Sequence, residues 1–311
     1  MTDRVVRAKA PAKINVFLGV GSLRSDGYHD LSTGFLAVSL FEHVEVRAAD
    51  DFSVTLDGSI DTSSVPLGES NLAIRAARAV AEACGATGGA RIRIEKHVPI
   101  AGGMGGGSAD AAATLVACNE LWNAGLSRDE LLALAADLGA DVPFSLTGGV
   151  AMGTGRGDQL SPALHRGKMH WVLVPADGEL STPVVFHELD KHRWSQQGEL
   201  ERNVTQPIVS VGAMQALRLG DVRMLAETMH NDLQAPALKL MPRLVGTLEL
   251  GERMGALAGI VSGSGPTCAF LCEDEESAVQ LVQDFCDQSI RAVHVTGPVA
   301  GAKITGAKVR S

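Results

Sequence analysis

A glycine-rich segment near residue 100 has the composition of a phosphate-binding loop. Five of the six residues from Gly102 to Gly107 are glycine, and Ser108 and Ala109 follow them. A strand-like alternation at 91–95 precedes the segment, and apolar residues at helical spacing follow it. A glycine turn between a strand and a helix lets the backbone approach a phosphate, and the helix N-terminus supplies free N–H groups and positive partial charge. The segment therefore predicts a nucleotide phosphate site.

The loop fits neither of two common nucleotide-binding motifs. Gly102 and Gly107 have the spacing of a Walker loop, but Ser108 stands where that loop needs lysine. Read from Gly103, a dinucleotide fingerprint would have Ser108 at its third glycine position. A structural turn that binds nothing is the alternative, although so many glycines are costly in backbone entropy.

Polar side chains near the start of the chain form a second candidate group. Lys13 and Asn15 flank Ile14, so on a strand the two polar residues share one face. Taken alone, such a lysine is typical of a solvated face. The segment Asp-Gly-Tyr-His at 26–29 contains Tyr28, the only tyrosine of the chain, and alone it indicates a turn with an exposed ring.

Helix signals place a carboxylate just past the end of a predicted helix. Residues 127–130 read Ser-Arg-Asp-Glu, a capping box that predicts a helix beginning at Ser127, and Gly139 should end that helix. Asp141 then lies just past the helix end. An earlier helix is predicted over about 72–83, with Ser70 or Asn71 as its cap.

The second half alternates strands and helices, which suits a split β-α-β sandwich. Strands are expected over 170–175, 267–272 and 291–295, and helices over about 211–231, 237–250 and 275–287. A second glycine cluster and Ser161-Pro162 indicate a boundary between domains 1–161 and 162–311. The basic tail from Gly297 is expected to be a poorly ordered end.

Composition narrows the function classes. The 311 residues suit two domains, and 45% hydrophobic with 20% charged residues is typical of a globular protein. A net charge of −9 argues against nucleic acid as a main partner. The five cysteines contain no C-x-x-C pair, so they predict neither a zinc site nor a disulfide framework. No apolar run reaches about 18 residues, and we expect a cytoplasmic protein without a membrane partner.

Three motifs together resemble those of the GHMP small-molecule kinases. They are Lys13-x-Asn15, the glycine loop from Pro99 to Asp110, and 262–266 (Ser-Gly-Ser-Gly-Pro). Within that family, Pro-Ala-Lys-Ile-Asn, Asp-Gly-Tyr-His and Leu-Gly-Ala-Asp-Val-Pro-Phe resemble the members that phosphorylate the 2-hydroxyl of a cytidine diphosphate-linked methylerythritol in non-mevalonate isoprenoid synthesis. The resemblance spans residues 8–273 and implies an α+β fold, with an N-terminal domain like domain 2 of ribosomal protein S5 and a ferredoxin-like C-terminal domain.

The resemblance also implies an ATP-dependent phosphotransferase that uses Mg²⁺. Asp141 would accept the proton of the attacking alcohol, and Lys13 would keep Asp141 ionised and stabilise the transferring phosphoryl group. Ser108 would contact a phosphate or the Mg²⁺. The residues implied to bind ATP are Asn71, Lys96, Pro99, Gly102, Gly103, Met104, Gly105, Gly106, Gly107, Ser108 and Ala109.

Substrate contacts follow from the same resemblance. Tyr28 and Phe186 would clamp the cytosine ring, and His29 would read its edge. The implied substrate residues are Asn15, Tyr28, His29, Thr182, Phe186, Gly263, Ser264 and Gly265. Phe186 could instead belong to the core and Lys96 to the surface. We expect the Asp110 side chain to point away from the ligand, because a carboxylate repels phosphate.

Other functions stay open at this stage. Another GHMP kinase, acting on mevalonate, homoserine or a sugar, would share the three motifs; the Asp-Gly-Tyr-His segment disfavours homoserine. A catalytically silent nucleotide-binding protein would be expected to lack Lys13 or Asp141, and both are present. A purely structural protein would leave three glycine loops unexplained. The expected partner is a small cytidine diphosphate-linked molecule, bound by a monomer or a homodimer.

Overall fold

The computed structural model describes residues 4–58, 60–196, 206–207 and 209–309. Two sheets organise these residues, so the mixed α+β content predicted from the sequence is confirmed. The larger sheet contains β1 (Arg4–Leu23), β2 (His29–Ala49), β3 (Ser53–Gly58), β4 (Gly89–Lys96), β5 (Val150–Thr154), β6 (Gln159–Pro162), β8 (His230–Asn231) and β12 (Lys303–Val309). The smaller sheet contains β7 (Met169–Val174), β9 (Ala258–Val261), β10 (Cys268–Cys272) and β11 (Val293–Gly297).

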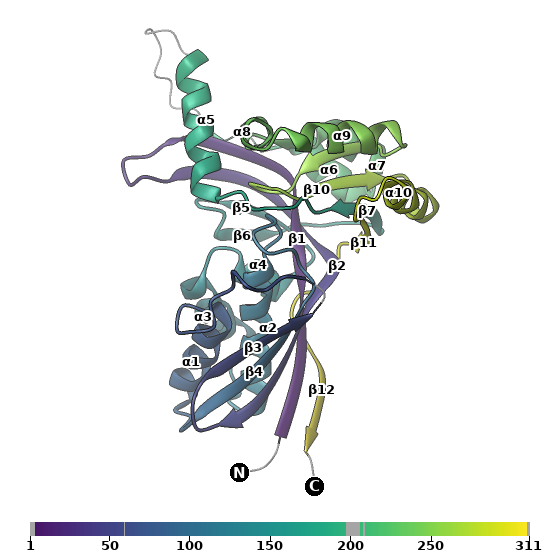
Figure 1. Cartoon of the computed structure of the whole chain (residues 1–311). Helices are drawn as coiled ribbons and strands as arrows, with labels where there is room; N and C mark the ends of the chain where they lie inside the picture. Colours follow the sequence, from purple (N-terminus) through teal and green to yellow (C-terminus); the bar gives the residue numbers. More distant parts are fainter. Residues whose placement is uncertain (1–3, 59, 197–205, 208, 310–311) are drawn as a thin grey trace.

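Two long antiparallel strands connect the halves of the molecule. β1 and β2 have 20 and 21 residues, and in Figure 1 they run past the lower helices and on beside the upper sheet. The order of the larger sheet is β12-β1-β2-β4-β3, with β5 paired to β2 and β8 paired to β1. Lys13 and Asn15 lie midway along β1 and line a cavity to which both halves contribute.

Four helices cover one face of the larger sheet in the lower half (Figure 1). They are α1 (Leu72–Cys84), α2 (Gly106–Leu121), α3 (Arg128–Leu138) and α4 (Val142–Thr147). The predicted caps are confirmed: the Asn71 side chain accepts the N–H of Ala73, and Ser127 forms a capping box with Glu130. α2 is buried almost all round, and its run of alanines lets α1 and the sheet approach it closely.

The upper half surrounds the smaller sheet with α5 (Thr182–Gln196), α6 (Val211–Leu219), α7 (Val222–Thr228), α8 (Gln234–Leu240), α9 (Arg243–Arg253) and α10 (Glu275–Asp287). The expected strands at 170–175, 267–272 and 291–295 correspond to β7, β10 and β11 with shifted ends. The single helix expected over 211–231 is wrong, because left-handed Gly220 ends α6 and Asp221 caps α7. The helix expected over 237–250 is likewise divided, between α8 and α9.

The expectation of a poorly ordered tail is wrong as far as residue 309. Residues 303–309 form β12, which pairs antiparallel with β1 and places Lys303 opposite Lys9. The small residues of this strand hid the alternation that marks a strand, whereas the open edge of β1 supplies the ladder of hydrogen bonds. Residues 310 and 311 lie outside the described residues. The boundary between 161 and 162 stays a prediction.

No helix within the described ranges is both long and apolar enough to cross a membrane.

Candidate active site

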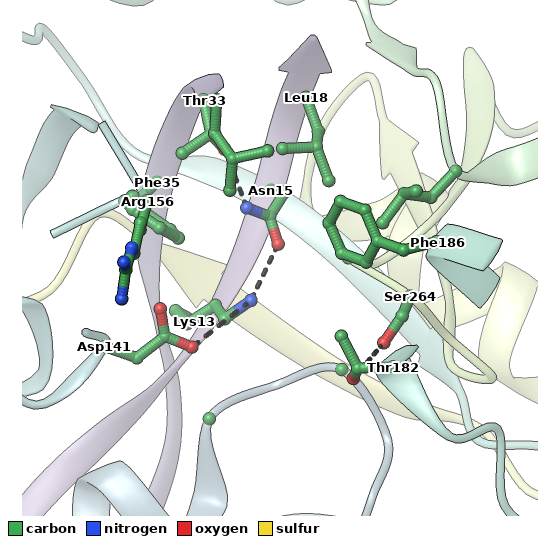
Figure 2. Close-up of a pocket in the computed structure, with 16 residues that line it drawn as sticks. Lys13, Asn15, Leu18, Thr33, Phe35, Asp141, Arg156, Thr182, Phe186 and Ser264 are labelled. Carbon is green, nitrogen blue, oxygen red and sulfur yellow. Dashed lines mark hydrogen bonds and ion pairs between the residues drawn. The ribbon is translucent and has the colours of Figure 1, made fainter. Parts of the chain in front are cut away.

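A cavity of about 290 Å³ opens where the glycine loop, the middle of β1 and the upper half meet (Figure 2). The N-terminal half contributes most of the lining residues, namely Lys13, Asn15, Leu18, Leu31, Thr33, Phe35, Gly103, Gly105, Asp141, Arg156 and Gly157. The C-terminal half contributes Thr182, Phe186, Leu233, Gly263 and Ser264. The cavity therefore depends on both halves being held together.

The alternation read from the sequence directs Lys13 and Asn15 into this cavity, as Figure 2 shows. Lys13 Nζ donates to Asn15 Oδ1 at 2.7 Å and lies 3.9 Å from Asp141 Oδ2. Asn15 Nδ2 in turn donates to Thr33 Oγ1 at 2.7 Å. Burial lowers the pKa of the Lys13 ammonium, and the Asp141 carboxylate opposes part of that effect. The network holds one buried cation beside one carboxylate.

Asp141 owes its position to the break between α3 and α4. Gly139 ends α3, and Asp141 occupies the N-cap position of α4, with Pro143 in the first turn of that helix. Its carboxylate makes no capping hydrogen bond, and the side chain is 34% exposed. A carboxylate in this place is open to a ligand in the cavity, and its role as proton acceptor, which the resemblance implies, stays a prediction.

The glycine loop turns sharply into α2. Gly105 is left-handed, with φ 72°, and caps α2 without a side chain, so no side chain satisfies the first N–H groups of that helix. The Lys13 N–H donates to Met104 O at 3.0 Å, and Ser262 Oγ donates to Gly103 O at 3.2 Å. The loop thus contacts both β1 and the third motif, and it leaves an uncapped helix end of the kind that binds anions.

Other residues assigned to ATP have different surroundings. Met104 and Ala109 are buried, and their apolar side chains offer a ligand no polar group. The Ala109 N–H already donates to Gly105 O. Asn71 caps α1 and donates to Pro66 O. Gly106, Gly107 and Ser108 form the first turn of α2, and Pro99 and Gly102 lie at the start of the loop. Binding of ATP at these positions stays a prediction.

Lys96 is buried beneath the loop, so the alternative of a surface lysine is wrong. Its side chain is 2% exposed, and its ammonium lies 2.6 Å from Glu42 Oε1 and 2.7 Å from Asp110 Oδ2. Glu42 also accepts the N–H groups of His97 and Val98, which begin the loop. The Lys96 side chain is thus committed to two carboxylates within the protein.

The Asp110 side chain points into this cluster, away from the loop tip, as expected. Burial raises the pKa of the Asp110 carboxyl to about 7, and attraction to Lys96 opposes the rise. Glu42 is another buried carboxylate, and burial raises its pKa as well. Among the described residues, nothing bonds to Asp110 Oδ1. The cluster therefore holds three ionisable side chains that are almost entirely buried.

Some of the predicted substrate residues line the cavity, and others do not. Thr182, Phe186, Gly263 and Ser264 line the cavity, and Thr182 Oγ1 lies 2.8 Å from Ser264 Oγ. Gly265, with φ 81°, packs inward, because an added Cβ would lie 2.8 Å from Val261. The third motif therefore faces the cavity through two of its residues.

The two rings of the proposed aromatic clamp, Phe186 and Tyr28, contact different partners in the structure. The Phe186 ring lies 5.1 Å from the His29 ring, and a His29 nitrogen lies 3.0 Å from Asp190 Oδ1. Tyr28, 51% exposed, is covered by the Arg156 guanidinium at 3.6 Å from the ring centroid. Phe186 lines the cavity while also packing against the upper core, and its contact with cytosine stays a prediction. Tyr28 and His29 do not line this cavity.

Sequence reasoning missed several cavity residues. Phe35 on β2 lies opposite Asn15, and Thr33 lies opposite Leu18 beyond a shift in register, a signal that only the strand pairing reveals. Arg156 stands between two glycines of the second glycine cluster, which from the sequence alone indicates only a domain boundary. Asn231, also missed, donates from Nδ2 to Val261 O and Gly263 O at 2.8 Å each and so holds the third motif in place.

Comparison with known proteins decides the family. The model of the GHMP kinases N terminal domain matches residues 71–149, and that of the GHMP kinases C terminal matches residues 213–291. The 4-diphosphocytidyl-2-C-methyl-D-erythritol kinase of Leifsonia xyli subsp. xyli is 57% identical over 300 residues, which cover 96% of this chain and 98% of that protein. The chain belongs to the 4-diphosphocytidyl-2-C-methyl-D-erythritol kinase family. The sequence-based resemblance is confirmed.

Solved structures agree. A crystal structure of 4-(cytidine 5'-diphospho)-2C-methyl-D-erythritol kinase is 32% identical, with a TM-score of 0.76 over 94% of this chain and 100% of that one. A homoserine kinase from Cytophaga hutchinsonii reaches a TM-score of 0.72 at 20% identity, over 96% of this chain and 97% of that one, which shows a shared fold alone. This member of the 4-diphosphocytidyl-2-C-methyl-D-erythritol kinase family therefore has the two-domain GHMP kinase fold predicted for it.

Proposed function

We propose that this kinase transfers the γ-phosphoryl group of ATP to the 2-hydroxyl of 4-diphosphocytidyl-2-C-methyl-D-erythritol. The observation that carries the proposal is the Lys13–Asp141 pair, 3.9 Å apart inside the cavity between the halves. The 57% identity to a kinase of that name supports the choice of substrate.

In the proposed reaction the 2-hydroxyl oxygen attacks the γ-phosphorus, and the bond to the β–γ bridging oxygen breaks to release ADP. Asp141 takes the hydroxyl proton, for which its exposed carboxylate is available. Lys13 stabilises negative charge on the transferring group, because its buried ammonium cannot be screened by water. Asn15 holds that ammonium in place.

The uncapped N-terminus of α2 is the proposed site for the ATP phosphates, and the Ser108 hydroxyl in its first turn is the proposed protein ligand of Mg²⁺. The described residues contain no group of three or more His, Cys, Asp or Glu side chains placed to hold a metal ion. A Mg²⁺ that accompanies ATP would therefore depend mainly on phosphate oxygens. When bound, it would neutralise charge on the phosphates.

Two other functions are distinguishable. A mevalonate or homoserine kinase would share the fold, since related folds occur at 17–20% identity. A silent nucleotide-binding protein would bind ATP without releasing ADP. The retained Lys13 and Asp141 favour catalysis over silent binding.

The test is ADP release from ATP and Mg²⁺, with the cytidyl substrate, mevalonate and homoserine each supplied separately. Wild type and Asp141→Asn are compared. Turnover with the cytidyl substrate alone, abolished in the variant, would support the proposal. Turnover with a small alcohol would assign a different substrate, and ATP binding without any turnover would favour the silent protein.

A further inference from the structure

Arg156 is the second cation of the cavity. Among the described residues that line it, the charged side chains are Lys13, Arg156 and Asp141. Figure 2 shows the Arg156 side chain on the same side of the cavity as Asp141, opposite Phe186. Two cations and one carboxylate leave a net positive charge, which suits a ligand with more than one negative group.

Arg156 and Lys13 differ in how their charges are engaged. The Lys13 ammonium is buried and held between Asn15 and Asp141. The Arg156 side chain is 47% exposed, and its ion pair with Asp26 is long, at 3.4 Å. Asp26 is shared with Arg24, which lies closer to it, at 3.1 Å. Arg156 therefore retains most of its capacity to bind an anion.

The position of Arg156 joins two parts of the proposed substrate site. Its guanidinium lies 3.6 Å from the centre of the Tyr28 ring, the proposed platform for cytosine. The same side chain lines the cavity that contains Asp141, the proposed acceptor of the hydroxyl proton. In the proposed substrate, a diphosphate separates the cytidine from the alcohol that reacts. A group that touches both ends of the site lies where that diphosphate must pass.

We propose that Arg156 binds the diphosphate of the cytidine diphosphate-linked substrate and thereby selects substrates of that class over small alcohols. The planar guanidinium donates paired hydrogen bonds to phosphate oxygens, which a lysine at the same place would not reproduce. The loop supports this role, because Gly155 and Gly157 are both left-handed and the Arg156 N–H is held by Asp158 Oδ1 at 3.0 Å. This inference rests on the proposed function.

The test uses Arg156→Gln, which shortens a half-exposed side chain and leaves the core intact. A charge-assisted bond to phosphate predicts a rise of about 10- to 100-fold in KM for the cytidyl substrate, with KM for ATP nearly unchanged. Inhibition by cytidine and by CDP is measured alongside. Wild type should prefer CDP, and the variant should lose that preference while binding cytidine as before. Arg156→Lys should recover only part of it.

Arg24→Gln is the matched control, since it removes the same charge from the same Asp26 network but does not line the cavity. Equal loss in both arginine variants would overturn the inference, because the effect would then be a general change of charge. An unchanged preference for CDP in Arg156→Gln, or a rise in KM for ATP alone, would also overturn it. A wild-type protein that binds neither cytidine nor CDP would instead overturn the proposed function and, with it, this inference.

Discussion

The ammonium of Lys96 lies 2.7 Å from the Asp110 carboxylate, beneath the first turns of α2. Lys96 is the last residue of β4, so this pair connects the two elements that flank the glycine loop. Glu42, which binds Lys96 as well as the backbone at the start of the loop, adds a third anchor from β2. The loop that we propose to hold ATP is therefore fixed at its base by buried charges.

The first prediction concerns this anchor. Lys96→Met leaves two carboxylates buried without a cation, and breaking a buried ion pair in this way typically costs about 3–5 kcal/mol of stability. We also expect KM for ATP to rise, because the loop loses its support. Denaturant unfolding and steady-state kinetics measure the two effects. Arg93→Met, which removes an exposed ion pair to Asp57 from the same strand, should change little. Equal loss in both variants would contradict a special role for the cluster.

The second prediction is a pH dependence of stability. The pKa of Asp110 is raised to about 7 in the folded state, whereas an unfolded aspartate titrates near 3.8. Between these values the folded state binds the extra proton, so this group makes the free energy of unfolding fall as pH rises from about 4 to 7, by at most about 1.4 kcal/mol per pH unit. The raised pKa of Glu42 acts in the same direction, and that of Lys96 acts only at alkaline pH.

Asp110→Asn removes this titration while keeping the shape of the side chain. The difference in unfolding free energy between the variant and wild type should shift in favour of the variant as pH rises from 5 to 7.5, whatever its value at pH 5. Urea unfolding at several pH values measures the trend. A difference that stays constant across this range would show that Asp110 is already ionised throughout.

The third prediction concerns the catalytic pair. Asp141→Asn should lower kcat by about 10²- to 10⁴-fold, because the attacking hydroxyl loses its proton acceptor. Lys13→Met should lower kcat as well, through loss of charge stabilisation. ADP release under saturating substrates measures both. Asp137→Asn changes an exposed carboxylate on α3 just before Asp141 and should retain full turnover. Full turnover in the Asp141 variant would refute the proposed base.

The fourth prediction separates two glycines of the loop. Gly103→Ala should destabilise the protein by about 1–3 kcal/mol, because φ is 74° and an added Cβ would lie 2.1 Å from Ser262 O. Gly107→Ala meets nothing closer than 3.6 Å, to Leu72, and should fold normally. Its methyl group would stand at the proposed phosphate site, so KM for ATP should rise without a change in Tm. An unaltered KM for ATP would place the phosphates elsewhere.

The fifth prediction tests the C-terminal strand. Removing residues 303–311, or breaking the ladder with Ala307→Pro, should lower Tm, because β1 loses its partner along one edge. For domains of 150–250 residues, each kcal/mol lost lowers Tm by roughly 2–4 °C. Lys303→Ala, an exposed change on the same strand, is the control. An unchanged Tm in the deleted protein would mean that the pairing contributes little.

Local signals predicted much of the fold and part of the site. The Asn71 cap, the Ser127 capping box and the start of α2 after the glycine loop all depend on neighbouring residues, and they were confirmed. The alternation of Lys13 and Asn15 also correctly predicted a shared face. Each of these features depends on residues that are close to one another along the chain, so it can be predicted from the local sequence.

Features that depend on distant contacts could not be predicted. The partners of Lys96 come from residues 42 and 110, and neither spacing has a periodicity that links them. Arg156 reaches Tyr28 only because a loop folds back over the β1–β2 hairpin. β12 has too little apolar alternation to be recognised, and its place is decided by the unpaired edge of β1. Tertiary pairing supplied these parts of the structure.

The pairing of β12 with β1 has a consequence for synthesis of the protein. β1 comprises residues 4–23, whereas the strand that covers its outer edge comprises residues 303–309. A ribosome translating from the N-terminus therefore completes the helices of the lower half, and then the upper half, before β12 exists to pair with β1. Until then, the nascent chain presents an unpaired strand edge at residues 4–9, with which other chains can pair.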